Sequence, residues 1–234
     1  MEIDFSKTDA VIFNMDGTIY DDKDLPLRMI LSDPLHAHWI KNDKKVRTQL
    51  RNIDFGDSNN FYSTYFNEMA KICHTTKEKY RIWYFTKFLP NMCNIINDYC
   101  DSREGLNDIF MQLRRCEIPF LIYSDYAFAK ERAHVLGLKE LSEDSFICAD
   151  EIGCQKPADR GYKKIEKMVL YKRPDKHNIF VISNDDKDGE GATKVGFSFI
   201  KIVDDAKMEN EITWNQFLQK FINALRQQAV KKTH

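Results

Sequence analysis

The sequence lacks the patterns that mark a disulfide-stabilised, a membrane-spanning or a nucleic-acid-binding protein. Its six cysteines include no C-x-x-C pair, so we expect buried free thiols rather than disulfides or a thiolate metal site. The formal net charge is −1, whereas nucleic-acid-binding faces rest on clustered Lys and Arg. The longest apolar runs, such as IPFLIY (118–123), are too short to cross a bilayer. We therefore expect neither a nucleic-acid nor a membrane partner.

Signals for targeting and for a histidine metal site are also missing. The opening residues, MEIDFSKTDA, are charged and contain no apolar signal core, which predicts a cytoplasmic protein. The two histidines of HAHW (36–39) would point to nearly opposite sides of a helix, so they do not favour a shared metal ion. With 234 residues, 43% of them hydrophobic and 30% charged, the chain has an ordinary globular composition. Nothing in it indicates a particular oligomeric state.

Residues 20–103 carry helical patterns and almost no strand signal. NNFYSTYFNEMAKIC (59–73) places aromatic side chains on one helical stripe, and KYRIWYFTKF (79–88) repeats this pattern. Such stripes usually form the core between packed helices. We therefore predict an all-helical unit over 20–103, inserted after the first strand.

The remaining segments, 1–19 and 104–234, alternate apolar strands with amphipathic helices. The expected strands are 10–14, 118–125, 145–150, 178–183 and 197–203. This alternation predicts an α/β fold with a Rossmann-like, doubly wound parallel sheet covered by helices on both faces. In such sheets the functional site lies at the carboxyl ends of the strands.

Polar residues follow four of these strands at the expected site edge. Asn14 and Asp16 come after the first strand, and Ser124 ends the second. Lys156 follows the third strand, and the acidic loop ISNDDKDGEGA (182–192) begins at the end of the fourth. Taken singly, these are a turn residue, a surface lysine or a solvated loop. Because the ends of parallel strands meet at one edge, their order predicts a single site.

These segments resemble the four motifs of the haloacid dehalogenase (HAD) superfamily. The family's D-x-D-G-T motif reads NMDGT (14–18) here, and its strand-ending Ser or Thr is Ser124. Its Lys-Pro is found in QKP (155–157), and its acidic loop before a helix is SNDDKDGEGA (183–192). The unit at 20–103 is similar to the family's C1-type cap. The resemblance implies a HAD-like Rossmannoid core with a helical cap and phosphatase-type chemistry on a small phosphorylated molecule.

The resemblance also implies roles for single residues. The first motif residue, here Asn14, is the family's nucleophile, and Asp16 exchanges protons with the leaving group and with water. The positions implied for phosphate binding are Gly17, Thr18, Ser124, Asp125 and Lys156, of which Ser124 and Lys156 also count as catalytic. Magnesium is implied at the first residue, at the backbone carbonyl of the second and at an acid of the fourth motif. The candidate metal positions are Asn14, Asp16, Asn184, Asp185 and Asp188.

Two amides depart from the family pattern. Asn14 stands in place of the nucleophile, and Asn184 stands where the first acid of the fourth motif is expected, four residues before Asp188. An amide is a negligible nucleophile beside a carboxylate, and losing a covalent nucleophile commonly removes several powers of ten in rate. Because Mg²⁺ favours carboxylate oxygen, we also expect a weakened metal site, unless Asp185 or Asp188 replaces the missing acid.

Three explanations remain open at this point. The chain is a natural family member that lost or weakened catalysis, an active Mg²⁺-dependent phosphatase carrying an engineered Asn14, or an enzyme with a different route through Asp16 or a nearby carboxylate. Two amides at both key acids favour natural divergence, since engineering needs only one change. Loss of catalysis leads to a different class of protein, a binding module for a phosphorylated ligand or for a protein. Retention of Lys156 with fewer acids favours anion binding, whereas retention of Asp16 favours an enzyme.

Overall fold

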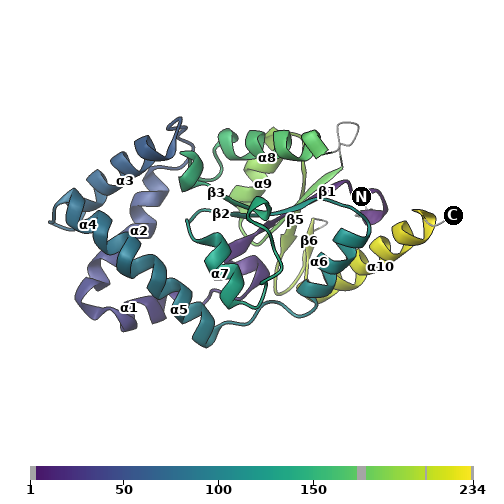
Figure 1. Ribbon diagram of the computed structural model, residues 1–234, viewed down its shortest axis with the longest axis horizontal. Helices are drawn as coiled ribbons and strands as arrows, with labels where there is room; N and C mark the ends of the chain where they lie inside the picture. The colour runs from purple at the N-terminus through teal and green to yellow at the C-terminus, as the bar shows by residue number, and fades with distance from the viewer. Residues whose placement is uncertain (1–3, 173–177, 209, 233–234) are drawn as a thin grey trace.

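The computed structural model describes residues 4–172, 178–208 and 210–232. Within these residues a parallel sheet has the strand order β3-β2-β1-β4-β5-β6 (Figure 1). The strands are β1 (Ala10–Asn14), β2 (Phe120–Ser124), β3 (Phe146–Cys148), β4 (Ile179–Ser183), β5 (Ser198–Ile202) and β6 (Glu211–Ile212). The predicted parallel α/β fold is confirmed. The strand predicted over 145–150 is shorter, because the chain turns into a 3₁₀ helix at Asp150–Ile152.

Alternation along β1 shows that helices cover both faces of the sheet. Val11 and Phe13 belong to a hydrophobic cluster with α6 and α10, whereas Ala10 and Ile12 belong to a second cluster with α8 and α9. The core helices are α6 (Leu106–Arg115), α7 (Ala129–Val135), α8 (Asp159–Lys172), α9 (Asp186–Lys194) and α10 (Trp214–Lys232). Since neighbouring strand residues point to opposite faces, this pattern confirms the double winding.

Residues 20–103 form helices on one side of the sheet (Figure 1). They are α1 (Leu25–Ser32), α2 (Ala37–Gln49), α3 (Ser58–Ile72), α4 (Lys77–Trp83) and α5 (Leu89–Tyr99), with a π-helical turn (Tyr84–Phe88) joining the last two. The predicted aromatic stripes meet: Phe66 of α3 packs against Tyr80 and Tyr84. We call residues 20–103 the cap and the rest the core; the exact division between them stays a prediction.

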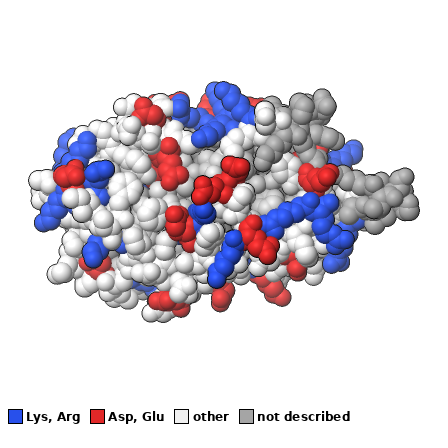
Figure 2. All heavy atoms as spheres, viewed as in Figure 1, with Lys and Arg blue, Asp and Glu red and all other residues white. Residues whose placement is uncertain are grey.

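Other expectations can be compared with the same structure. All six cysteines are free, and every one except the half-buried Cys100 is buried. No described helix combines the length and the apolar character needed to cross a membrane. Figure 2 shows acidic and basic side chains interspersed over the face in view, without a continuous basic surface. His36 hydrogen-bonds to Asp33 and packs on Trp39, which is a structural role.

Candidate active site

The strand ends bring the four predicted segments together at one edge of the sheet. Asn14 pairs in register with Tyr123 of β2, the residue before Ser124. Lys156 Nζ lies 2.8 Å from Asn14 Oδ1, and Ser124 Oγ lies 3.3 Å from Asp16 Oδ2. Asn184 Oδ1 is 3.2 Å from Asn14 Nδ2. Asn14, Asp16, Lys156 and Asn184 line a cavity of about 430 Å³ between core and cap.

The buried Asn14 amide has a defined orientation. The ammonium of Lys156 can only donate hydrogen bonds, so the Asn14 oxygen must face it and Asn14 Nδ2 must face the other way. Asn14 Nδ2 donates to the backbone carbonyl of Asp16 at 2.9 Å and to Asn184 Oδ1 at 3.2 Å, and it lies 3.3 Å from Thr18 Oγ1. The resemblance places a magnesium ion against the first two of these oxygens. An N–H group therefore points where the family pattern requires a cation.

The turn after β1 fits closely around Asn184. Gly17 has φ +75°, and a Cβ there would lie 2.2 Å from Asn184 Nδ2, so glycine is required for both reasons. Thr18 Oγ1 donates to Asn184 Oδ1 at 3.0 Å and accepts from the Asn184 backbone N–H, also at 3.0 Å. Gly17 and Thr18 thus hold Asn184 in place.

Asp188 forms a buried charge pair with Lys156. Lys156 Nζ lies 3.1 Å from Asp188 Oδ1 and also donates to the Tyr123 carbonyl. Tyr162 OH and Ser183 Oγ each donate to Asp188 at 2.6 Å. Burial lowers the pKa of Lys156, but the charges of Asp188 and Asp125 outweigh it and place that pKa above its ordinary value. Lys156 therefore stays cationic, and its charge is balanced within the site.

Asp16 is paired with a buried arginine. Arg132 Nη1 and Tyr20 OH each lie 2.5 Å from Asp16 Oδ1. Arg132 Nη2 also donates to Ser124 Oγ at 2.6 Å. Burial raises the pKa of Asp16, but the Arg132 charge and the two hydrogen bonds outweigh it, so this pKa lies below its ordinary value. A carboxylate held ionised in this way is a poor proton donor.

The other predicted residues lie at the rim of the site. Asp185 caps α9 by accepting from the Lys187 backbone N–H and pairs with Lys187 Nζ at 2.7 Å. Asp125 Oδ1 accepts from the Lys156 backbone N–H at 3.2 Å. Each carboxylate therefore has a hydrogen-bonding role in the fold, and the replacement of Asn184 by Asp185 or Asp188 as a metal ligand stays a prediction.

The residues present do not fit a tightly held magnesium ion. Within the described ranges, no group of three or more His, Cys, Asp or Glu side chains is placed to hold a metal. The amides of Asn14 and Asn184 hydrogen-bond to each other, and the Asp188 carboxylate is occupied by Lys156 and two hydroxyls. Mg²⁺ would need oxygens that these N–H and O–H donors now occupy.

Three residues of the site were not predicted from the sequence. Arg132, Tyr20 and Tyr162 bond directly to predicted carboxylates. For Arg132 a signal existed, because it shares one face of its helix with the buried Ala129, Ala133 and Leu136. An arginine on an apolar helical face needs a buried partner, but the sequence does not say which carboxylate that is.

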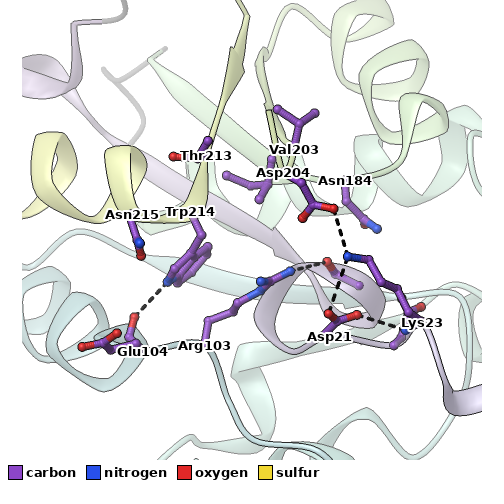
Figure 3. A pocket seen from close by; sticks show the side chains of 13 residues that line it. Asp21, Lys23, Arg103, Glu104, Asn184, Val203, Asp204, Thr213, Trp214 and Asn215 are labelled. Atoms are coloured by element: carbon purple, nitrogen blue, oxygen red, sulfur yellow. Dashed lines mark hydrogen bonds and ion pairs between the residues drawn. The ribbon is translucent and has the colours of Figure 1, made fainter. Parts of the chain in front are cut away.

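A second pocket, of about 400 Å³, adjoins the turn after β1 (Figure 3). Lys23 sits there between Asp21 and Asp204, and Trp214 Nε1 donates to the Glu104 carbonyl. The pocket shares Gly17, Asp22 and Asn184 with the residues that surround the candidate site. Its lining carries more acids than bases, so it does not have the character of an anion site.

The fold and the site define a class: a doubly wound α/β protein with a helical insertion and a strand-end site of two aspartates, one serine, one lysine and two amides. A family model of haloacid dehalogenase-like hydrolases matches residues 8–196. The chain therefore belongs to this hydrolase family. No curated protein sequence matches the chain.

Solved structures share the fold. A HAD hydrolase of family IA from Entamoeba histolytica is 16% identical with a TM-score of 0.60, covering 94% of this chain and 100% of that one. A HAD phosphatase from Thermococcus onnurineus is 17% identical with a TM-score of 0.59, covering 93% and 99%. An L-2-haloacid dehalogenase from Xanthobacter autotrophicus is 18% identical with a TM-score of 0.55, covering 86% and 79%. At these identities the likeness shows the fold alone.

Proposed function

We propose that this family member binds a small phosphorylated molecule in the cavity between core and cap and does not hydrolyse it at an enzymatic rate. One observation carries the proposal: Asn14 occupies the nucleophile position, and its amide is hydrogen-bonded on both sides. Asn14 Oδ1 accepts from Lys156, and Asn14 Nδ2 donates to the Asp16 carbonyl and to Asn184. The amide offers no charge for attack on phosphorus and leaves no place for a cation.

The second chemical role of the family motif is also disfavoured. Protonating a leaving group requires a protonated Asp16, whereas Arg132 and Tyr20 hold this side chain as a carboxylate. The Lys156 ammonium supports phosphate binding, because it lines the cavity. Its hydrogen bond to Asn14 Oδ1 can be replaced by a hydrogen bond to a phosphoryl oxygen of the ligand. The family's usual dependence on Mg²⁺ is, in this proposal, lost or much weakened in this chain.

Two measurements on the full chain test the proposal. Hydrolysis of a generic aryl phosphate with Mg²⁺ should stay at background, and titration calorimetry should detect binding of inorganic phosphate. Turnover of about 1 per second, as in working enzymes, or no binding of phosphate would overturn it.

Reversion separates the remaining explanations. Asn14→Asp together with Asn184→Asp should restore more activity than the two single changes combined, because both positions serve one ion. If Asn14→Asp alone gives full activity, the fourth motif was never impaired, and an active phosphatase with a single disabling change at position 14 is the better description.

A further inference from the structure

Cap helix α2 and the turn that follows it place four side chains along the cavity. Ile40, Lys44, Arg47 and Arg51 are spaced by four, three and four residues, and all four line the cavity. The first three lie within α2, where such spacing keeps side chains on one helical face, and Arg51 lies in the turn after the helix ends at Gln49. Three of the four are basic, and two acids of the cap, Asp22 and Asp43, line the cavity with them.

Arg47, the buried one of these three basic residues, is already engaged. Its Nε lies 3.1 Å from Asp43 Oδ1, its Nη2 donates to Tyr84 OH at 2.6 Å, and its Nη1 donates to the Asp125 carbonyl at 3.3 Å. Its guanidinium also stacks over the Tyr126 ring, 4.0 Å from the centroid. Because all three nitrogens have partners, Arg47 ties the cap to the core and has little capacity left for a ligand.

Lys44 and Arg51 differ from Arg47 in this respect. Neither side chain forms an ion pair or hydrogen bond with another residue in the part of the chain that the structure describes. Lys44 is exposed and Arg51 is half-buried. The charge of Lys44 acts on Asp22 and lowers its pKa slightly. Burial and the charge of Asp16 have the larger effect and raise the pKa of Asp22 to about 6.

The acids around the cavity are mostly neutralised by other bases. Each of four carboxylates has its own cation within 3.1 Å, in the pairs Asp16–Arg132, Asp43–Arg47, Asp185–Lys187 and Asp188–Lys156. Lys44 and Arg51 are therefore the lining cations left without an ion-pair partner among the described residues. Apolar side chains from α1 and α5, including Leu25, Met29 and Met92, line the wall beside them.

We infer that the ligand carries a second anionic group and that Lys44 and Arg51 bind it. This inference rests on the proposed function, which places a phosphate at the core end near Lys156. The second group, a carboxylate or another phosphate, suits the forked donors of Arg51 together with the ammonium of Lys44. The apolar wall suits a short hydrocarbon body between the two anions. The substrate class is thus a small phosphate ester with an acidic far end.

Matched probes test this inference on the full chain. Titration calorimetry would compare ω-carboxyalkyl phosphates with ω-hydroxyalkyl phosphates of the same chain lengths, which differ only in the far anion. We expect the best carboxyalkyl phosphate to bind about tenfold more tightly than its hydroxyl counterpart, a difference of about 1.4 kcal/mol. In Lys44→Gln/Arg51→Gln this preference should fall close to unity, while the affinity for the hydroxyalkyl phosphate stays within about twofold.

Lys41→Gln/Lys45→Gln is the matched control, because it removes the same two positive charges from exposed positions of α2 that do not line the cavity. It should keep the tenfold preference. If wild type binds both probes equally, or if the control loses the preference as fully as the double variant does, the inference is wrong and phosphate binding stands. If neither probe nor inorganic phosphate binds, the proposed function itself fails and the inference fails with it.

Discussion

At the scale of single residues, the pairing with Arg132 keeps Asp16 ionised, whereas a general acid must carry a proton to donate. Arg132 is fully buried and also bonds to Ser124, so one guanidinium fixes two predicted catalytic side chains. The charge that keeps Asp16 ionised also stabilises the fold. The pair therefore makes the site rigid at the expense of proton transfer.

Arg132→Met should destabilise the protein by about 3 kcal/mol, because it leaves a carboxylate without its buried partner. Urea unfolding of the full chain measures this loss. Asp16→Asn/Arg132→Met should lose less than the sum of the two single changes, since both act on one pair. Additive losses would show that the two side chains do not interact as the structure indicates.

The sequence predicted the site at this scale in part. Asn14, Asp16, Ser124, Lys156 and Asn184 meet because each lies at the end of a strand or after it, and the strands are visible as apolar runs in the sequence. The partners Arg132 and Tyr20 were not predicted, because side-chain pairing across distant segments leaves no periodic signal. The hydrogen bonds of the Asn14 amide to Lys156, Asp16 and Asn184 were not predicted either, because they depend on distances between segments that are far apart in the sequence.

At the scale of elements, the sequence patterns did not predict the start of helix α9 or the presence of strand β6. Residues 182–192 were described as an acidic loop, yet α9 begins within them at Asp186 because Asp185 caps it. Strand β6 was not predicted, since two residues are too few for alternation to register. Longer elements were predicted correctly because each buries a repeating apolar face.

The loop after β3 carries Asp150, which faces cap helix α2. Asp150 is fully buried, accepts from the Ala127 N–H at 3.1 Å and lies 3.7 Å from Arg47 Nη2. Burial raises its pKa to about 6 despite the Arg47 charge. This carboxyl therefore titrates at the junction of core and cap.

The raised pKa of Asp150 predicts a pH dependence of stability. From about pH 4, near the unfolded pKa, to about pH 6, folded Asp150 keeps a proton that the unfolded chain has released. Stability from this group is therefore fully present at lower pH and is lost as pH rises through 6. The free energy of unfolding of wild type minus that of Asp150→Asn should fall by about 1–3 kcal/mol between pH 4.5 and pH 7. A difference that stays flat over this range would contradict the assignment.

At the scale of the whole molecule, cap and core share one hydrophobic cluster. It includes Phe61 and Tyr84 of the cap together with Phe13 and Phe217 of the core. Arg47 adds polar bridges between the two. Because this contact is continuous, we expect cap and core to unfold together.

Tryptophans in both the cap and the core allow the joint unfolding of cap and core to be tested. Trp39 and Trp83 lie in the cap and Trp214 in the core, so Trp214→Phe reports on the cap, and Trp39→Phe/Trp83→Phe reports on the core. In each variant the urea midpoint from fluorescence should equal that from circular dichroism. Midpoints that separate would show that the cap unfolds independently.

The central claim is that the Asn14 amide takes the place of both a nucleophile and a cation. Asn14→Asp would set a carboxylate oxygen against the Asp16 carbonyl and Asn184 Oδ1, which now accept from Asn14 Nδ2 at 2.9 and 3.2 Å. Three facing oxygens repel one another unless a cation lies between them.

The most direct measurement is the melting temperature of wild type and Asn14→Asp across a magnesium titration, with a chelator as the zero point. Without magnesium the variant should melt about 5 °C below wild type, corresponding to about 1–3 kcal/mol. Magnesium should raise the variant's melting temperature and leave that of wild type unchanged. A wild-type protein stabilised by magnesium as strongly as the variant would contradict the account.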